Sequence, residues 1–427
     1  MGYLFLFRKK NFLLLLSTHV LSQLTIYIMN YLLLIQIFQY TGSSIATSLL
    51  WVSYAIPAIL VGPVASASVD FLEYRKVLVT TNILQSLIIF LYGLLYMNSL
   101  YLLFFVAMSY SLLNQFYVPA ELSSVPAMVD KKNLSFANSV FFITQQGSII
   151  LGFLGASVMK SSFGFVNSIY LCSLFLFFAF ISTLFLPSKN AERKRKSDKI
   201  EVVILGFFKE ILLGYKFIRK ERNVSFPFLL LLGIQIIISV LVVNAPNISR
   251  DFLRINLDLA GIIMVVPASV GAISGGLLIP KLMKSGMRKI KIIKLSLFIS
   301  AMAFLGFSLL IKMLPYINSL ALSMLLLYFL GAAFMGISVP AQTFLQEKTP
   351  GGYRGRVFGN FWFLVTILSV FPVILSGFIT DILGIQSLML IIALAFIFSL
   401  VAINKKVKLT NRTRFKTAFQ ARFESLR

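Results

Sequence analysis

The sequence contains few of the side chains that form the active sites of most soluble enzymes. It has one cysteine, Cys172, one histidine, His19, and 14 Asp and Glu among 427 residues. A single cysteine excludes a disulfide within the chain, and a metal or haem centre built from several Cys and His ligands is excluded with it. The sequence also lacks a glycine-rich phosphate loop and a cluster of carboxylates or nucleophiles. We therefore predict that the protein is not an enzyme, uses no metal or cofactor and does not consume ATP directly.

Charge of either sign is scarce as well, and long apolar runs take its place. Charged residues make up 12% of the chain and hydrophobic residues 58%, whereas a soluble domain has about a quarter charged residues. A helix needs about 20 apolar residues to span a bilayer, and backbone groups in lipid must be paired within that helix. We expect an all-α membrane protein with twelve spans at residues 12–38, 45–69, 77–97, 100–120, 136–159, 165–186, 224–248, 259–282, 292–314, 319–344, 357–380 and 385–403.

The basic residues are distributed very unevenly around these spans. Of the 39 Lys and Arg, 35 lie in the terminal segments and the even-numbered connections; the other connections hold only Lys160, Arg250, Arg254 and Lys312. Positive residues accumulate on the cytoplasmic side of membrane proteins. We therefore expect both termini and the central connection on the cytoplasmic side of a bacterial plasma membrane. The net charge of +25 then needs no nucleic-acid partner.

The two halves of the chain resemble each other. Val118-Pro119-Ala120 recurs as Val339-Pro340-Ala341, and Gly62 followed by Arg75-Lys76 recurs as Gly275 followed by Arg288-Lys289. Two repeats of six helices are the layout of one major class of transporters. We predict an N-terminal six-helix bundle at 1–187, a basic linker at 188–223, a C-terminal six-helix bundle at 224–404 and a basic cytoplasmic tail at 405–427.

The linker and the tail both combine basic with apolar residues. Residues 200–218 show the pattern of an amphipathic helix lying in the membrane interface. The tail spaces Phe415, Phe419 and Phe423 four residues apart among basic side chains. We expect the linker helix to contact membrane lipid; the tail either does the same or is solvated.

A distinctive loop follows the second predicted span. Gly62 precedes Asp70, Glu73 and the basic pair Arg75 and Lys76. This pattern resembles the loop 2–3 signature of the major facilitator superfamily, and Arg354-Gly355-Arg356-Val357-Phe358-Gly359 resembles its macrolide-efflux and enterobactin-exporter branch. The resemblance implies two pseudo-symmetric six-helix bundles, usually as a monomer. It also implies that Asp70 latches to the start of span eleven, near Val357; the alternative is that Asp70 and Glu73 only cap and solubilise a turn.

The first predicted span carries a polar stripe. His19, Gln23, Tyr27 and Asn30 are spaced 4, 4 and 3 residues apart, which places them on one face of a helix. Polar groups are costly in lipid, so this face should meet protein or a water-filled cavity. By the resemblance, spans one, four, seven and ten line a substrate cavity. We expect Gln145 of span five to reach inward as well. The further candidates are Tyr110, Asn114, Tyr117, Gln145, Gln235, Ser239, Tyr328, Ser338 and Gln342. Hydrogen bonding between helices, without substrate contact, is the alternative for the whole set.

Two residues are candidates for carrying a proton. Histidine is the side chain whose charge ordinarily changes near neutral pH, so His19 is the first candidate. Glu121, at the predicted cytoplasmic end of span four, is the second. A histidine that only stabilises the helix packing is the alternative for His19.

The resemblance implies a secondary transporter that exports a small amphipathic molecule, such as a macrolide-like drug or a siderophore, by alternating access and with proton coupling. Few fixed charges and many aromatic residues near the predicted cavity fit neutral or weakly charged cargo. A lysophospholipid flippase of the same fold is the alternative. A channel or a membrane enzyme has no support in the sequence.

Overall fold

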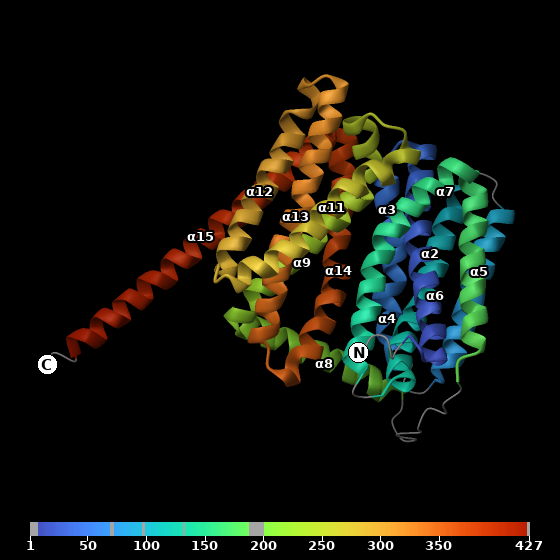
Figure 1. Ribbon diagram of the computed structural model, residues 1–427, viewed down its shortest axis with the longest axis horizontal. Helices are drawn as coiled ribbons and strands as arrows, with labels where there is room; N and C mark the ends of the chain where they lie inside the picture. Colours follow the sequence, from blue (N-terminus) through green and yellow to red (C-terminus); the bar gives the residue numbers. More distant parts are fainter. Residues whose placement is uncertain (1–6, 69–71, 96–98, 131–132, 188–199, 425–427) are drawn as a thin grey trace.

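Each long apolar run of the sequence forms a helix in the computed structural model, which describes residues 7–68, 72–95, 99–130, 133–187 and 200–424 (Figure 1). No strand is present in these ranges. The first half builds α2 (Lys10–Thr41), α3 (Ser44–Leu60), α4 (Gly62–Ser68), α5 (Tyr74–Leu94), α6 (Leu100–Met128) and α7 (Leu134–Leu184). After α8 (Ile200–Lys220), the second half builds α9 (Arg222–Val243), α10 (Ala245–Asn247), η2 (Ile248–Leu253), η3 (Leu257–Leu259), α11 (Ala260–Lys284), α12 (Lys289–Leu309), η4 (Ile311–Met313), α13 (Tyr316–Lys348), α14 (Gly351–Leu383) and α15 (Ile385–Glu424).

The helices are consistent with twelve membrane crossings. Ten of the described helices are long and apolar enough to cross a membrane. One of them, α7, is two spans, because Gly164 interrupts it with φ 77° and ψ 173°, a conformation that glycine adopts without steric cost. The apolar helix α3 has 17 residues, and α4 continues it after a turn at Val61.

The buried apolar residues divide into two bundles. One core cluster holds residues from Ile218 to Ile403. Two other clusters hold residues from Phe12 to Leu186, with Ala260 as their single member from the second half. In the first bundle α2 and α5 pack against α7, and in the second α11 and α12 pack against α13. Each bundle therefore has its own core.

The two ends of the molecule join the bundles differently. We call the end that holds the turns at Gly42 and Gly384 the outer end, and the opposite end, where α8 lies, the inner end (Figure 1). α3, which begins at the outer end, packs against α14 of the other bundle. At the inner end α8 contacts α4 of the first bundle and α14 of the second. From the distribution of basic residues we expect the inner end to face the cytoplasm.

Three helices extend at one end by about six residues or more beyond the predicted span. α6 continues to Met128 instead of ending at Ala120, α14 begins at Gly351 instead of Val357, and α15 continues to Glu424 instead of Ile403. In α6 the predicted span ended at the first carboxylate, whereas this carboxylate is buried inside the bundle. The extension of α15 runs away from the bundle (Figure 1), so most of the predicted tail is helical. Residues of the predicted linker helix form α8, and its place in the membrane interface stays a prediction.

Glycines set the spacing of α11 and α13. A Cβ atom added at Gly271 would collide with the carbonyl oxygen of Tyr328, and one added at Gly331 with that of Ala268. At Gly275 the added atom would lie 2.9 Å from the carbonyl oxygen of Ala332. Small residues let membrane helices approach closely. The backbones of α11 and α13 are therefore in close contact in the C-terminal bundle.

Candidate functional site

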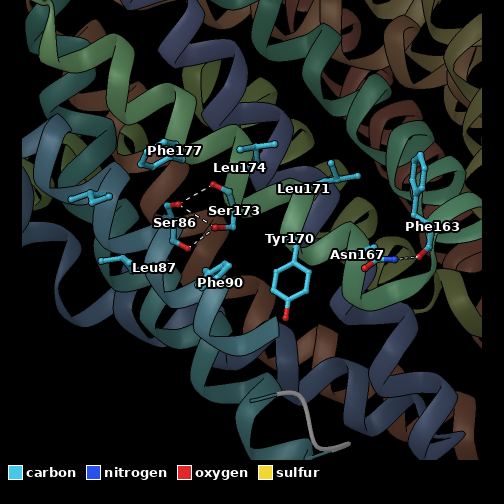
Figure 2. Close-up of a pocket in the computed structure, with 11 residues that line it drawn as sticks. Ser86, Leu87, Phe90, Phe163, Asn167, Tyr170, Leu171, Ser173, Leu174 and Phe177 are labelled. Carbon is cyan, nitrogen blue, oxygen red and sulfur yellow. Dashed lines mark hydrogen bonds between the residues drawn. The ribbon is translucent and has the colours of Figure 1, made fainter. Parts of the chain in front are cut away.

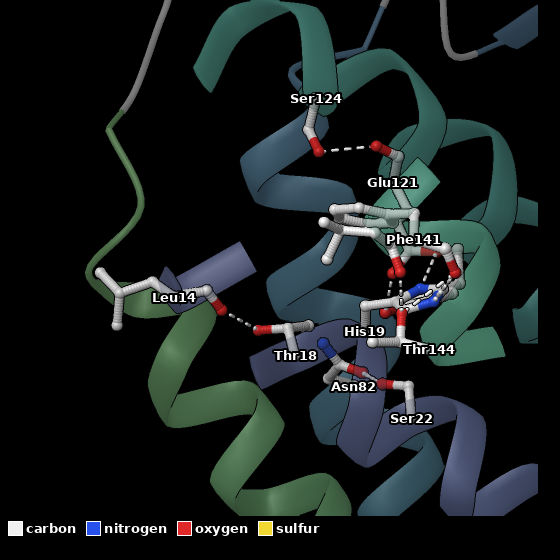
Figure 3. Close-up of polar contacts among 11 residues, drawn as sticks. Leu14, Thr18, His19, Ser22, Asn82, Glu121, Ser124, Phe141 and Thr144 are labelled. Atoms are coloured by element: carbon white, nitrogen blue, oxygen red, sulfur yellow. Dashed lines mark hydrogen bonds and ion pairs between the residues drawn. The ribbon is translucent and has the colours of Figure 1, made fainter. Parts of the chain in front are cut away.

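Four helices of the N-terminal bundle bring a set of polar groups together in its interior. They are His19 and Ser22 of α2, Asn82 of α5, Glu121 of α6 and the carbonyl group of Phe141 of α7 (Figure 3), together with Tyr117 of α6. We call this set the His19–Glu121 cluster. His19 is 4% exposed and Glu121 is 3% exposed. Buried ionisable groups are costly unless they are paired, so the partners of these two side chains decide what the cluster can do.

His19 and Glu121 are partners of each other. Nδ1 of His19 lies 3.0 Å from Oε2 of Glu121, although the N–H direction of the ring does not give this contact standard hydrogen-bond geometry. The two side chains form an ion pair when the imidazole is protonated and the carboxyl group is ionised. The two candidate proton carriers, which the sequence offered separately, thus form one unit.

The carboxylate is held from within its own helix. The Tyr117 hydroxyl, four residues earlier on α6, donates a hydrogen bond of 2.6 Å to Oε1 of Glu121. Residues four apart lie one above the other on a helix face, so α6 itself aligns the two side chains. Oε1 and Oε2 therefore each have a fixed partner, Tyr117 and His19.

The imidazole is held on its other side by α7. Nε2 of His19 lies 3.3 Å from the carbonyl oxygen of Phe141, and the rings of these two residues have centroids 4.5 Å apart. A carbonyl only accepts hydrogen bonds, so Nε2 must carry a proton. Nδ1 then faces Oε2 of Glu121 at 3.0 Å without a hydrogen bond of standard geometry.

The cluster continues towards the centre of the bundle through Ser22. The Ser22 hydroxyl donates to Oδ1 of Asn82 at 3.2 Å, and Asn82 is fully buried. Nδ2 of Asn82 has no hydrogen-bond partner within the described part of the chain. Asn82 was missed by the sequence analysis, although an Asn within a predicted span is itself a signal because amides are costly in lipid.

The remaining members of the polar stripe follow His19 along α2. Gln23, Tyr27 and Asn30 are half-buried. Tyr27 packs against α7, with its Cβ against Gly152 and its ring centroid 6.4 Å from that of Phe153. At Tyr27 the stripe therefore meets protein, one of the two surroundings that the sequence allowed.

The other predicted cavity residues differ in burial. Tyr110 and Tyr117 are both 1% exposed, so in this conformation they lie inside the N-terminal bundle. Of the rest, Gln342 is exposed, whereas the half-buried ones are Asn114, Gln145, Gln235, Ser239, Tyr328 and Ser338. The Tyr328 hydroxyl accepts a hydrogen bond of 3.1 Å from Ser274. A substrate role for all of these residues remains a prediction.

A groove of about 620 Å³ lies away from these residues, between α5 and the second half of α7 (Figure 2). Apolar side chains such as Leu87, Phe90 and Phe177 dominate its lining. At its base the Ser86 hydroxyl donates to the carbonyl oxygen of Ser173 at 2.9 Å. None of the predicted cavity residues lines this groove.

The predicted gating loop is described only in part. Asp70 lies outside the described residues. Gly62 faces α6, where an added Cβ would lie 3.3 Å from Oε1 of Gln115. Nζ of Lys76 lies 3.3 Å from Oε2 of Glu73, and Arg75 donates to the carbonyl oxygen of Leu184 at 2.5 Å.

Because α14 begins at Gly351, Val357 is not at its N-terminus but is buried in the C-terminal core. A latch from Asp70 would have to reach the earlier N–H groups of α14.

No group of three or more His, Cys, Asp or Glu in the described ranges could hold a metal ion. The sequence analysis also missed the acidic residues Asp258 and Asp381, which contact the opposite bundle. Their partners lie far away along the chain, so sequence spacing gives no signal for these contacts.

The family model described as Major Facilitator Superfamily matches residues 15–372. The chain belongs to the major facilitator superfamily. It is 24% identical over 387 residues to the uncharacterised MFS-type transporter YfiS of Bacillus subtilis (strain 168), and the match covers 88% of each chain. This superfamily chain is therefore an integral membrane transporter.

Solved structures agree on the fold. A crystal structure of the nucleoside transporter NupG matches with a TM-score of 0.69 at 16% identity, over 92% of this chain and 99% of that one. The POT family transporter PepTSo matches with a TM-score of 0.68 at 10% identity, over 95% and 99% of the two chains. These likenesses show the superfamily fold.

Proposed function

We propose that this transporter exports small amphipathic molecules in exchange for protons, as a monomer working by alternating access, and that the His19–Glu121 pair carries the proton. The observation that supports the proposal is the pair itself: two ionisable groups, 3.0 Å apart, that are each almost completely buried inside the N-terminal bundle. A pair of this kind is costly as a purely structural element, because replacing it by apolar residues is often neutral or stabilising.

The number of protons on the pair, and the net charge that follows from it, explain how the pair would couple to a conformational change. Imidazolium with carboxylate, and neutral imidazole with carboxylic acid, hold the same number of protons and no net charge. Adding or removing one proton leaves a net charge in surroundings of low dielectric, which is strongly disfavoured. Proton exchange therefore requires that water reach His19 and Glu121, and water can reach them only when the helices around the cluster move.

The position of the pair favours exchange with the inner end. His19 lies nine residues after the start of α2 at Lys10, a rise of about 14 Å along the helix. In the described ranges, the hydrogen bonds between the bundles join residues near the outer ends of their helices, such as Ser44 with Asn247 at 3.0 Å. We infer that this conformation is closed at the outer end.

The proposed cargo follows from the predicted cavity residues. Gln23, Asn30, Gln235 and Tyr328 offer hydrogen bonds without fixed charge, and aromatic rings accompany them. Such a lining suits neutral or weakly charged amphipathic molecules, of the macrolide or siderophore kind that the sequence resemblance implies. A lysophospholipid has the same character, so a flippase activity is the alternative.

Accumulation of radiolabelled erythromycin, as a macrolide probe, tests the proposal in cells that lack their own exporters. We expect expression of the protein to lower accumulation, and a protonophore to remove the difference. His19→Gln and Glu121→Gln should each remove it as well, and the double variant should be no worse than either one, because the residues act as a unit. Glu347→Gln is the matched control, since Glu347 pairs with Lys289 at the surface of the other bundle.

Export that survives the protonophore would show that protons do not drive it. Translocation of labelled lysophosphatidylcholine in proteoliposomes, without macrolide export, would instead support the flippase.

A further inference from the structure

A carboxylate from one bundle lies at the start of a helix from the other. Asp381, in the last turn of α14, accepts hydrogen bonds from the backbone N–H groups of Ser44 at 2.7 Å and Ile45 at 3.0 Å. It also accepts one from the Ser43 hydroxyl at 2.6 Å. Ser43 is the N-cap residue of α3. One side chain of the C-terminal bundle thus makes three hydrogen bonds to the N-terminal bundle.

The position of Asp381 in the chain is unfavourable for its own helix and favourable for α3. The last turn of a helix carries partial negative charge, so an acidic residue there destabilises its own helix, whereas the N-terminus of a helix attracts negative charge. The first N–H groups of α3 also have no partner within that helix. Asp381 is therefore placed unfavourably for α14 and favourably for α3.

A second contact joins the bundles at the same end. Lys160, near the break in α7, is 2.9 Å from Asp258 of η3 and donates to Gln39 of α2 at 2.8 Å. Lys160 is 8% exposed, so its charge is largely shielded from water and needs this partner. Two carboxylates, Asp381 and Asp258, thus join the bundles at the outer end, alongside hydrogen bonds such as that of Asn247 with Ser44.

We propose that Asp381 is a latch that holds the outer end closed and that must be released before the transporter opens outward. The contact stabilises only the conformation in which α3 and α14 meet at their outer ends. It is the counterpart, at the opposite end of the same helix pair, of the contact predicted between Asp70 and the start of α14. The proposal depends on alternating access, but not on the cargo or on the role of His19.

Spin labels at two exposed outer positions report the state of this end. Tyr101 of α6 is 87% exposed and Ile317 of α13 is 77% exposed, so Tyr101→Cys and Ile317→Cys in a Cys172→Ser background give one label on each bundle. Electron–electron double resonance then measures the distribution of distances between them, without any cargo. The labelled protein that keeps Asp381 should give mainly the short distance of the closed outer end.

Asp381→Ala and Asp381→Asn should increase the population with the longer distance, the first by roughly 2- to 5-fold, as expected for the loss of a solvent-exposed carboxylate at a helix N-terminus. Asp381→Asn should have the smaller effect, since it keeps an acceptor oxygen. Glu347→Gln removes a carboxylate of the same bundle that lies away from the outer end. It should leave the distribution of distances between the labels unchanged.

A second pair of variants tests the latch from the α3 side. Proline is tolerated as the first residue of a helix but has no N–H group, and Ser43 before it is already extended, with φ −112° and ψ 129°. Both variants remove the Ser44 hydroxyl, which accepts a hydrogen bond from Asn247, and Ser44→Pro alone also removes a donor to Asp381. We expect Ser44→Pro to shift the distances more than Ser44→Ala does. Unchanged distances in folded Asp381→Ala, or equal shifts in the two Ser44 variants, would overturn the proposal.

Discussion

The two bundles are related by an internal repeat, yet they differ in where they place charge. In the match of Val118-Pro119-Ala120 with Val339-Pro340-Ala341, the residue that follows is Glu121 in one half and Gln342 in the other. Glu121 is buried against His19, whereas Gln342 is exposed. This position therefore occurs once in each half of the chain, and only its N-terminal copy carries an ionisable side chain.

The two bundles also differ in how their helices pack at equivalent places. Gly275 and Gly331 bring α11 and α13 of the C-terminal bundle into backbone contact. Gly62, at the position that matches Gly275, faces only the end of the Gln115 side chain. This close contact makes α11 and α13 hard to rearrange, whereas the proposed proton carriers lie in the N-terminal bundle.

The largest expected difference between the bundles is at the repeated position itself. Glu121→Ala leaves His19 without its partner, and breaking a buried ion pair costs about 3–5 kcal/mol of stability. Gln342→Ala, at the exposed matching position, should change stability by no more than about 0.5 kcal/mol. Denaturant unfolding of both variants in the same detergent checks this. Equal losses would mean that burial of Glu121 has no energetic consequence.

A smaller effect is expected from the residue that positions Glu121. Tyr117→Phe removes the hydroxyl that donates to Oε1 at 2.6 Å, and a hydrogen bond to a charged group contributes about 1.5–3 kcal/mol. Tyr328→Phe, in the C-terminal bundle, removes a hydroxyl that accepts from Ser274 and should cost only about 0.5–1.5 kcal/mol. Thermal unfolding of the two variants ranks them; the reverse order contradicts the assignment.

The packing of the C-terminal bundle can be tested with alanine. Gly331→Ala forces a methyl group against the Ala268 carbonyl, and overpacking costs about 1–3 kcal/mol. Gly147→Ala in α7 meets no atom within 4 Å, so it should be neutral or stabilising by up to about 1 kcal/mol, since Ala favours helix over Gly. Melting temperatures of the two proteins give the comparison, and a stable Gly331→Ala variant would show that α11 and α13 can separate.

The smallest effect is expected when the charge is moved to the other bundle. Gln342→Glu places a carboxylate at an exposed position without a histidine partner, so stability should change by at most about 0.5 kcal/mol. Combined with Glu121→Gln, it should not restore protonophore-sensitive export. Restored export would show that the two repeat positions are interchangeable.

The fold was largely predictable from the sequence, because long apolar runs have one stable solution in lipid. The break between spans five and six, at Gly164, was placed correctly between residues 159 and 165. The end of span four was placed too early, since a window of apolar residues treats Glu121 as a boundary and cannot see His19 on another helix.

The candidate site was predictable residue by residue but not as an arrangement. The helical spacing identified the stripe that begins at His19, and scarcity of charge identified Glu121. That these two residues touch, and that Tyr117 and Asn82 surround them, depends on how α2, α5 and α6 pack. The same holds for Asp381, whose partner Ser43 is 338 residues away in the chain.

Proton movement in proteoliposomes tests the central claim most directly. With a pH-sensitive dye inside the vesicles and erythromycin as the probe, the wild-type protein should move protons only when the macrolide is transported. His19→Gln should still exchange labelled for unlabelled macrolide across the membrane, but without any proton movement. Macrolide-dependent proton movement at the wild-type rate in His19→Gln would contradict the assignment of the His19–Glu121 pair as the proton carrier.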